Sequence, residues 1–87
     1  MATRELEAKA FRGISVLIAA KISKEIDASG SKAILYKNDE SADASSVLDV
    51  LALGADEDSK IKVIVYGDNE DKIIKTISEI LTDGAGI

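Results

Sequence analysis

The sequence contains no cysteine, no histidine, no proline and no tryptophan. Without cysteine and histidine, the chain cannot form disulfides, a thiol nucleophile or a Cys/His zinc site, and it lacks the commonest general base. Without proline, slow prolyl isomerisation is not expected to limit folding. No apolar run approaches the roughly 18 residues of a membrane span, and the opening MATRELEAKA has no apolar signal region. We therefore expect a cytoplasmic protein that is not an enzyme.

Composition indicates one globular domain over residues 1–87, because 46% of the residues are hydrophobic and 31% are charged. The net charge of −5 disfavours nucleic acid as a partner, since phosphates attract a basic surface. The same charge favours a basic protein partner. No cofactor is predicted.

The stretch from Phe11 to Lys24 has the pattern of a strand end, a glycine turn and the start of an apolar helix. Gly13 suits a tight turn, and Ser15 is a favoured N-cap. Apolar residues then recur every four positions, which predicts a helix over residues 16–27; they are Ile18, Ile22 and Ile26. A strand feeding a capped helix also presents amides and a positive dipole end to an anion.

Hydrophobic spacing and turn residues predict the remaining elements. Strands are expected at 5–11, 32–37, 40–43 and 60–66, with Ile61, Val63 and Val65 facing inward. A short helix is expected at 46–53, and a long helix is expected from Asp68 or Asn69 to Gly84. The order βαββαβα favours an α+β fold, a two-layer sandwich with an antiparallel sheet and helices on one face. By element order alone, a ferredoxin-like or ACT-like ligand domain fits equally well.

Two segments resemble HPr, the phosphocarrier of the bacterial sugar phosphotransferase system. Residues 13–19, Gly-Ile-Ser-Val-Leu-Ile-Ala, resemble its active-site loop Gly-Ile-His-Ala-Arg-Pro-Ala. Residues 46–54, Ser-Val-Leu-Asp-Val-Leu-Ala-Leu-Gly, resemble its pattern Ser-Ile-Met-Gly-Val-Met-Ser-Leu-Gly at the family's distance from that loop. Residues 60–81 are similar to its last strand and helix. The resemblance implies the HPr-like open-faced β-sandwich, four antiparallel strands covered on one face by three helices.

At the first loop, the residues that carry the family's chemistry are replaced. Ser15 stands where the family has its active-site histidine, Leu17 replaces the phosphate-binding arginine, and Ile18 replaces the proline. A serine phosphate is a stable ester, whereas a carrier needs a labile phosphohistidine, and no base beside Ser15 is evident. We therefore predict no catalytic residue and interpret Ser15 as a helix N-cap.

Ser46 matches the family position that HPr kinase/phosphorylase of Gram-positive bacteria modifies for regulation. A phosphate there adds about −1.5 to −2 charge at a helix N-terminus, where the dipole favours it. Asp43 and Asp49 would repel it, and Asp49 stands where the family usually has glycine. Regulatory phosphorylation and a simple N-cap role therefore both stay open, with Ser45 as a competing acceptor.

The resemblance also implies a partner-binding face, which in HPr docks enzyme I, transporter subunits and the catabolite regulator. Here it has lost an arginine and gained aliphatic residues, a composition typical of an interface. The partner could be HPr kinase/phosphorylase, another regulator or a second copy in a homodimer; alternatively, Ile18, Val47 and Val50 turn into the core. The predicted face comprises Leu17, Ile18, Val47, Leu48 and Leu51.

Two acidic runs, 56–58 and 68–71, lack the alternating ligands and bidentate glutamate of a calcium loop, so no metal site is predicted. Three functions remain. The leading one is an HPr-like regulatory or adaptor protein of carbon metabolism that is not a phosphocarrier. The others are an interaction domain that kept only the fold and self-associates, and a small-molecule domain that binds at the first helix start.

Because the sequence has no histidine, we predict that the protein accepts no phosphate from phosphoenolpyruvate and enzyme I. Incubation with labelled phosphoenolpyruvate should leave it unlabelled beside a labelled HPr control. Ser15→His alone should still give a poor carrier, because Leu17 cannot donate charged hydrogen bonds to the phosphoryl group. Stoichiometric labelling of the unmodified chain at Ser15 would contradict this prediction.

Overall fold

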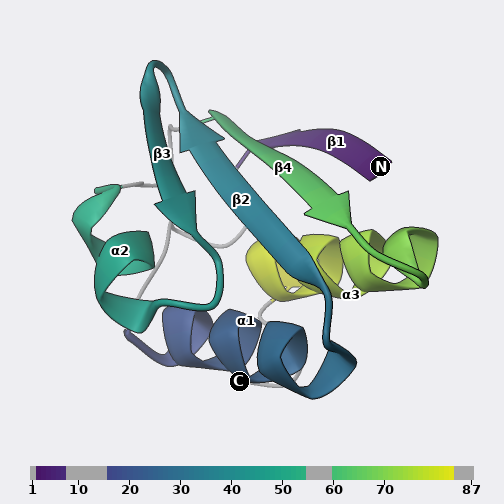
Figure 1. Cartoon of the computed structure of the whole chain (residues 1–87). Coiled ribbons are helices and arrows are strands. Elements are labelled where there is room, and N and C mark those ends of the chain that lie inside the picture. The colour runs from purple at the N-terminus through teal and green to yellow at the C-terminus, as the bar shows by residue number, and fades with distance from the viewer. Residues whose placement is uncertain (1, 8–15, 55–59, 84–87) are drawn as a thin grey trace.

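The fold is described from a computed structural model over residues 2–7, 16–54 and 60–83. Seven elements follow one another in the predicted order βαββαβα (Figure 1). The strands are β1 (Ala2–Glu7), β2 (Lys32–Lys37), β3 (Glu40–Asp43) and β4 (Lys60–Tyr66). The helices are α1 (Val16–Ser29), α2 (Val47–Ala52) and α3 (Glu70–Asp83).

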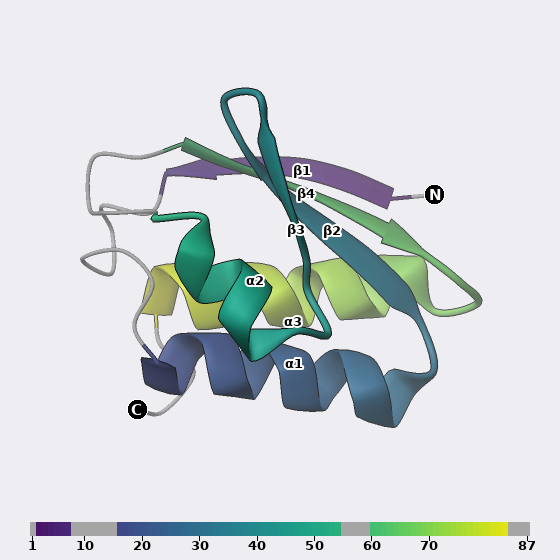
Figure 2. The ribbon, with the colours of Figure 1, turned by 60° about the vertical axis from the view of Figure 1, so that its left-hand side comes forward.

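The four strands of the described residues form one antiparallel sheet in the order β1-β4-β2-β3. Figure 2 shows the helices α1, α2 and α3 together on one side of this sheet. The predicted open-faced sandwich is therefore confirmed. No helix within the described ranges combines the length and apolarity needed to cross a bilayer.

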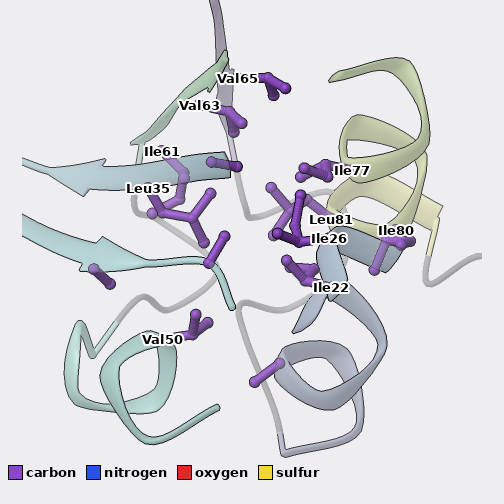
Figure 3. Close-up of a cluster of buried hydrophobic side chains, with 14 of the residues drawn as sticks. Ile22, Ile26, Leu35, Val50, Ile61, Val63, Val65, Ile77, Ile80 and Leu81 are labelled. Atoms are coloured by element: carbon purple, nitrogen blue, oxygen red, sulfur yellow. The ribbon is translucent and has the colours of Figure 1, made fainter. Parts of the chain in front are cut away.

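The core lies between the sheet and the helices. Ile61, Val63 and Val65 of β4 are buried as predicted, because successive strand residues point to opposite faces of a sheet. From the helical layer, the four-residue stripe of α1 and the apolar face of α3 point toward them (Figure 3). The helical residues that contribute are Ile18, Ala19, Ile22, Ile26, Val50, Ile73, Ile74, Ile77, Ile80 and Leu81.

Several boundaries differ from the predicted ones. β1 begins at Ala2, three residues before the predicted start, and residues 8–11 of that prediction lie outside the described residues. α1 continues beyond Asp27 to Ser29, whose hydroxyl donates to the carbonyl of Ile26 at 2.9 Å and accepts from the amide of Ser31 at 3.1 Å. Gly30, with φ +70°, then ends the helix in the left-handed conformation that glycine adopts at little cost. The predicted stop at Gly84 lies outside the described residues.

Candidate functional site

The turn between β3 and α2 holds Ser46 at the start of a helix. Ser46 is the N-cap of α2, with φ −108° and ψ 113°, and its Oγ accepts a hydrogen bond from the amide of Asp49 at 3.2 Å. The carbonyl of Ser46 also accepts from the amide of Val50 at 3.0 Å. The predicted capping role of Ser46 is therefore confirmed.

Asp43 organises the two serines that precede the helix. Its Oδ1 accepts two hydrogen bonds from Ser45, from the amide at 2.9 Å and from the hydroxyl at 2.7 Å. Its backbone carbonyl accepts from the amide of Ser46 at 3.0 Å. A carboxylate that accepts from the amide two residues later forms an Asx-turn. The hydroxyl of Ser45 is therefore committed to a carboxylate, whereas the oxygen of Ser46 caps the helix.

These hydrogen bonds also change the acidity of Asp43. The Ser45 hydroxyl bond, followed by the Ser45 amide bond, holds the pKa of the Asp43 carboxyl below its ordinary value of 3.8. Desolvation of the carboxyl opposes this lowering of the pKa, and the charge of Lys32 adds to it. The carboxylate is thus the form that the turn favours.

A buried hydroxyl ties the same turn to α1. Ser23 is 6% exposed and donates to the carbonyl of Ala44 at 3.0 Å. The amide of Ala44 donates in turn to the carbonyl of Ala33 in β2 at 3.0 Å. Sequence reasoning missed Ser23, although a polar residue directly after Ile22 in an apolar stripe was the available signal. The turn that bears Ser46 is therefore tied to both layers of the fold, to α1 in the helical layer and to β2 in the sheet.

The other end of α2 is held by a lysine. Lys37 of β2 donates from Nζ to the carbonyl of Gly54 at 2.9 Å. Gly54 has φ +69° and follows the C-cap residue Leu53. A cation at this position satisfies a carbonyl of the helix end. Together with the cap at Ser46, it fixes the orientation of the short helix.

The predicted partner-binding face divides into exposed and buried residues. Leu17 is 62% exposed and Leu48 is 79% exposed, and Val16, which was not predicted, is 60% exposed. Val47 and Leu51 are half-buried and pack against the core. α1 and α2, which carry these residues, are in contact.

The assignment of Ile18 to that face is wrong. Ile18 is 0% exposed, because it lies four residues before Ile22 on the buried stripe of α1. The alternative that Ile18 and Val50 turn into the core is correct for both residues, since Val50 is also 0% exposed.

Two further predictions concern residues that the structure does not describe. Ser15 and the amides before Val16 lie outside the described residues, as does the acidic run 56–58. Within the residues that are described, no cluster of acidic side chains is arranged to hold a metal ion.

The family is decided by a family-model match. The model described as "PTS HPr component phosphorylation site" matches residues 2–83. The chain belongs to the HPr family. No curated protein matches the sequence. The family's name refers to a phosphorylation site, yet this HPr-family chain has no histidine anywhere in its sequence.

Solved structures share the fold at low sequence identity. HPr-C-His from Thermoanaerobacter tengcongensis aligns with TM-score 0.87 and 22% identity, over 100% of this chain and 98% of that one. A Mycoplasma histidine-containing phosphocarrier protein aligns with TM-score 0.86 and 20% identity, over 97% and 96% of the two chains. Crh of Bacillus subtilis, a catabolite repression protein that forms a swapped dimer, aligns with TM-score 0.74 and 18% identity over 83% of each chain. At these identities the likeness shows the HPr fold.

The lowered pKa of Asp43 predicts a pH-dependent contribution to stability. A carboxyl whose pKa is lower in the folded than in the unfolded state stabilises the fold above the unfolded value, here 3.8. That contribution is lost as the pH falls through the folded pKa. Asp43→Asn keeps an oxygen acceptor but removes the charge, so it should lower the free energy of unfolding at neutral pH. In urea titrations the gap between the wild type and the variant should close below pH 3.8.

Ser45→Ala provides the matched control, because it removes the largest cause of the shift. In the Ser45→Ala background, Asp43→Asn should have a smaller pH-dependent effect, as a double-mutant cycle would measure. A stability gap between the wild type and Asp43→Asn that stays constant from neutral pH to acid would contradict this account of the turn.

Proposed function

We propose that this HPr-family chain is a regulatory or adaptor protein that is phosphorylated on Ser46 and carries no phosphate to sugar transporters. One observation carries the proposal: a member of a phosphocarrier family contains no histidine. A phosphoserine ester is too stable to pass its phosphoryl group on, but its stability suits a signal that persists until a phosphatase removes it. The modification would be made by a kinase of the HPr kinase/phosphorylase class.

The hydrogen bonds of Ser46 leave it suited to accept a phosphoryl group. Its Oγ accepts from the amide of Asp49, so that bond does not use the hydroxyl proton, which a kinase base can remove. The new bond forms between Oγ and the γ-phosphorus of ATP, the bond to ADP breaks, and the proton passes to the kinase. The phosphate oxygens of the product can still accept from backbone amides.

The neighbouring Ser45 is a poorer acceptor. Its hydroxyl donates to Asp43 Oδ1 at 2.7 Å, so phosphorylation would break this bond and bring a phosphate against a carboxylate. Like charges at such a distance repel strongly. Asp43 therefore favours Ser46 over Ser45 as the phosphorylated residue.

A phosphate on Ser46 would act on the exposed surface of α2. Leu48, two residues along the chain, is 79% exposed. An added charge of about −1.5 to −2 near this side chain disfavours partners that would bury Leu48. It favours partners that present arginine or lysine to the phosphate. We therefore infer a change of partner on phosphorylation, because the modification adds charge without removing the cap.

We predict that HPr kinase and ATP add one phosphate to the protein and that this phosphate is on Ser46. Ser46→Asn should abolish the label, because asparagine caps a helix about as well as serine but has no hydroxyl. Ser46→Ala would also remove the label, but with a cap loss of about 1 kcal/mol, so Asn is the cleaner variant. Mass spectrometry of the intact protein and its peptides measures the site and the stoichiometry.

Ser45→Ala is the matched control and should be labelled like the wild type. Labelling that survives Ser46→Asn and disappears in Ser45→Ala would assign the wrong serine. No labelling of the wild type beside an active control substrate would argue for the alternative function below.

The alternative is an interaction domain that kept the HPr fold and binds a partner, or a second copy, through the α1–α2 face. The exposure of Leu17 and Leu48 supports it, since large aliphatic side chains in water gain from burial at an interface. Val47 and Leu51, half-buried beside them, would form the edge of the contact.

For this alternative we predict that Leu48→Asp weakens partner capture or self-association while the fold stays intact. The side chain is 79% exposed, so a charge there desolvates only when a partner binds. Pull-down and sedimentation measure binding, and circular dichroism with urea titration measures stability. Unfolding of Leu48→Asp, together with a monomer that captures nothing, would assign Leu48 a structural role instead.

A further inference from the structure

Strands β2 and β4 carry the same five-residue pattern on their outer face. Residues 32–36 read Lys-Ala-Ile-Leu-Tyr, and residues 62–66 read Lys-Val-Ile-Val-Tyr. The second and fourth residues of each pattern are buried beneath the helices. Because side chains alternate along a strand, the first, third and fifth residues share the opposite face. We call these six residues the Lys-Ile-Tyr face: Lys32, Ile34, Tyr36, Lys62, Ile64 and Tyr66.

The register of the two strands gives this face a two-fold pattern. Ile34 pairs with Ile64 at the centre, Lys32 pairs with Tyr66 on one side, and Tyr36 pairs with Lys62 on the other. Each lysine therefore stands beside a tyrosine, and a half-turn about the isoleucine pair exchanges the two strands. β2 and β4 are the two central strands of the sheet (Figure 1).

Within the described residues, no helix or strand covers this face, and it is more apolar than a solvated sheet face usually is. The described helices all lie on the other side of the sheet (Figure 2). Tyr66 is 40% exposed, while Ile34, Ile64 and Tyr36 are half-buried. Antiparallel sheets with one solvated face normally carry polar residues there, so an isoleucine pair flanked by two tyrosines requires an explanation.

We infer that the Lys-Ile-Tyr face binds a second copy of this chain by packing sheet against sheet. A symmetric dimer places one patch on itself, so the patch must be complementary to its own two-fold image. A two-fold axis in the plane of this face, along or across the strands, places isoleucine on isoleucine at the centre. The same rotation places each lysine of one copy opposite a tyrosine of the other copy, which gives four Lys–Tyr contacts around the central isoleucines.

Both contacts are favourable when water is excluded. Isoleucine side chains gain from burial, and a lysine ammonium over a tyrosine ring gains a cation–π interaction. Aligned sheets pack with their strands within about 30° of each other, and the flexible lysine side chain can follow its ring over that rotation. If one copy slid along its strands by two residues, its lysines would lie on isoleucines of the other copy. The arrangement that places isoleucine on isoleucine is therefore favoured.

A charged residue beside the face lies on the edge strand β3. Asp43 pairs with Ile34 in the register of β2 and β3, and the charge of Lys32 acts on its carboxyl. This acidic position at the rim reduces the repulsion between the lysines of the two copies. A contact centred on six residues is small beside the roughly 20–30 residues per partner of a standard interface, so the dimer is weak and forms at high concentration.

Sedimentation equilibrium tests the inference on the unmodified chain, up to about 1 mM, where weak contacts become populated. The mean mass should rise from 9.2 kDa toward twice that value. Tyr66→Lys, at an exposed position, should weaken the dimer at least tenfold by placing lysine on lysine, and Tyr66→Phe should leave it unchanged. Ile64→Asp should abolish it. Leu48→Asp is the control for the α1–α2 face and should have no effect.

Cross-linking between introduced cysteines can locate the contact, because the unmodified chain has no cysteine that would compete for the reagent. Stacked sheets lie about 10 Å apart, beyond the roughly 4.4–6.8 Å between Cα atoms that a disulfide spans, so a short bismaleimide is the suitable reagent. Ile64→Cys alone should cross-link if the axis runs across the strands. A mixture of Ile34→Cys and Ile64→Cys should give the mixed product if the axis runs along them. Leu48→Cys and Lys24→Cys should give neither product.

Three results would overturn the inference: a monomer at every concentration, a dimer that Tyr66→Lys does not weaken, or a dimer that only Leu48→Asp disrupts. None of these readouts involves phosphorylation, so the inference fails or stands separately from the proposed function of Ser46.

Discussion

Burial of one face of the sheet beneath three helices constrains the rest of the described molecule. Leu35, Val63 and Val65 are fully buried on that face, and the alternation of strand side chains then forces their neighbours onto the other face. All contact with the helices therefore comes from one side, and the turn that bears Ser46 must return from β3 into the helical layer. The site and the open face are both consequences of this one-sided core.

Alternation and spacing were sufficient to predict most of this arrangement. The inward positions of β4, the apolar face of α3 and the N-cap at Ser46 each follow from residues within a few positions of one another. Ile18 is a residue whose position was predicted wrongly from the sequence. The four-residue spacing with Ile22 indicated burial, but the resemblance to a family docking loop placed Ile18 on the surface. Here the helical periodicity, which reports the residue's own packing, was the better guide.

The remaining features depend on pairs of residues that are distant or whose geometry the sequence does not specify. Ser23 and Ala44 are separated by 21 positions, and no local pattern predicts that one hydroxyl meets one carbonyl. Along β4 alone, Ile64 interrupts the alternation of apolar and polar residues. Its pairing with Ile34 places a second isoleucine beside it on the open face, where the two half-buried side chains partly shield each other from water. Register is a property of two strands, so the sequence of one strand cannot reveal it.

The shortness of α2 bears on how a phosphate at Ser46 would act. A helix of 6 residues is too short to be stable alone, so its position depends on external anchors. Val50 and Leu53 bury the helix against the core, Lys37 binds the carbonyl of Gly54, and Ser46 accepts from Asp49. A phosphate retains oxygen acceptors at the last of these anchors and leaves the others untouched. Phosphorylation is therefore expected to change the charge of the surface around Leu48 and not the fold, so a partner would detect the modification by electrostatics.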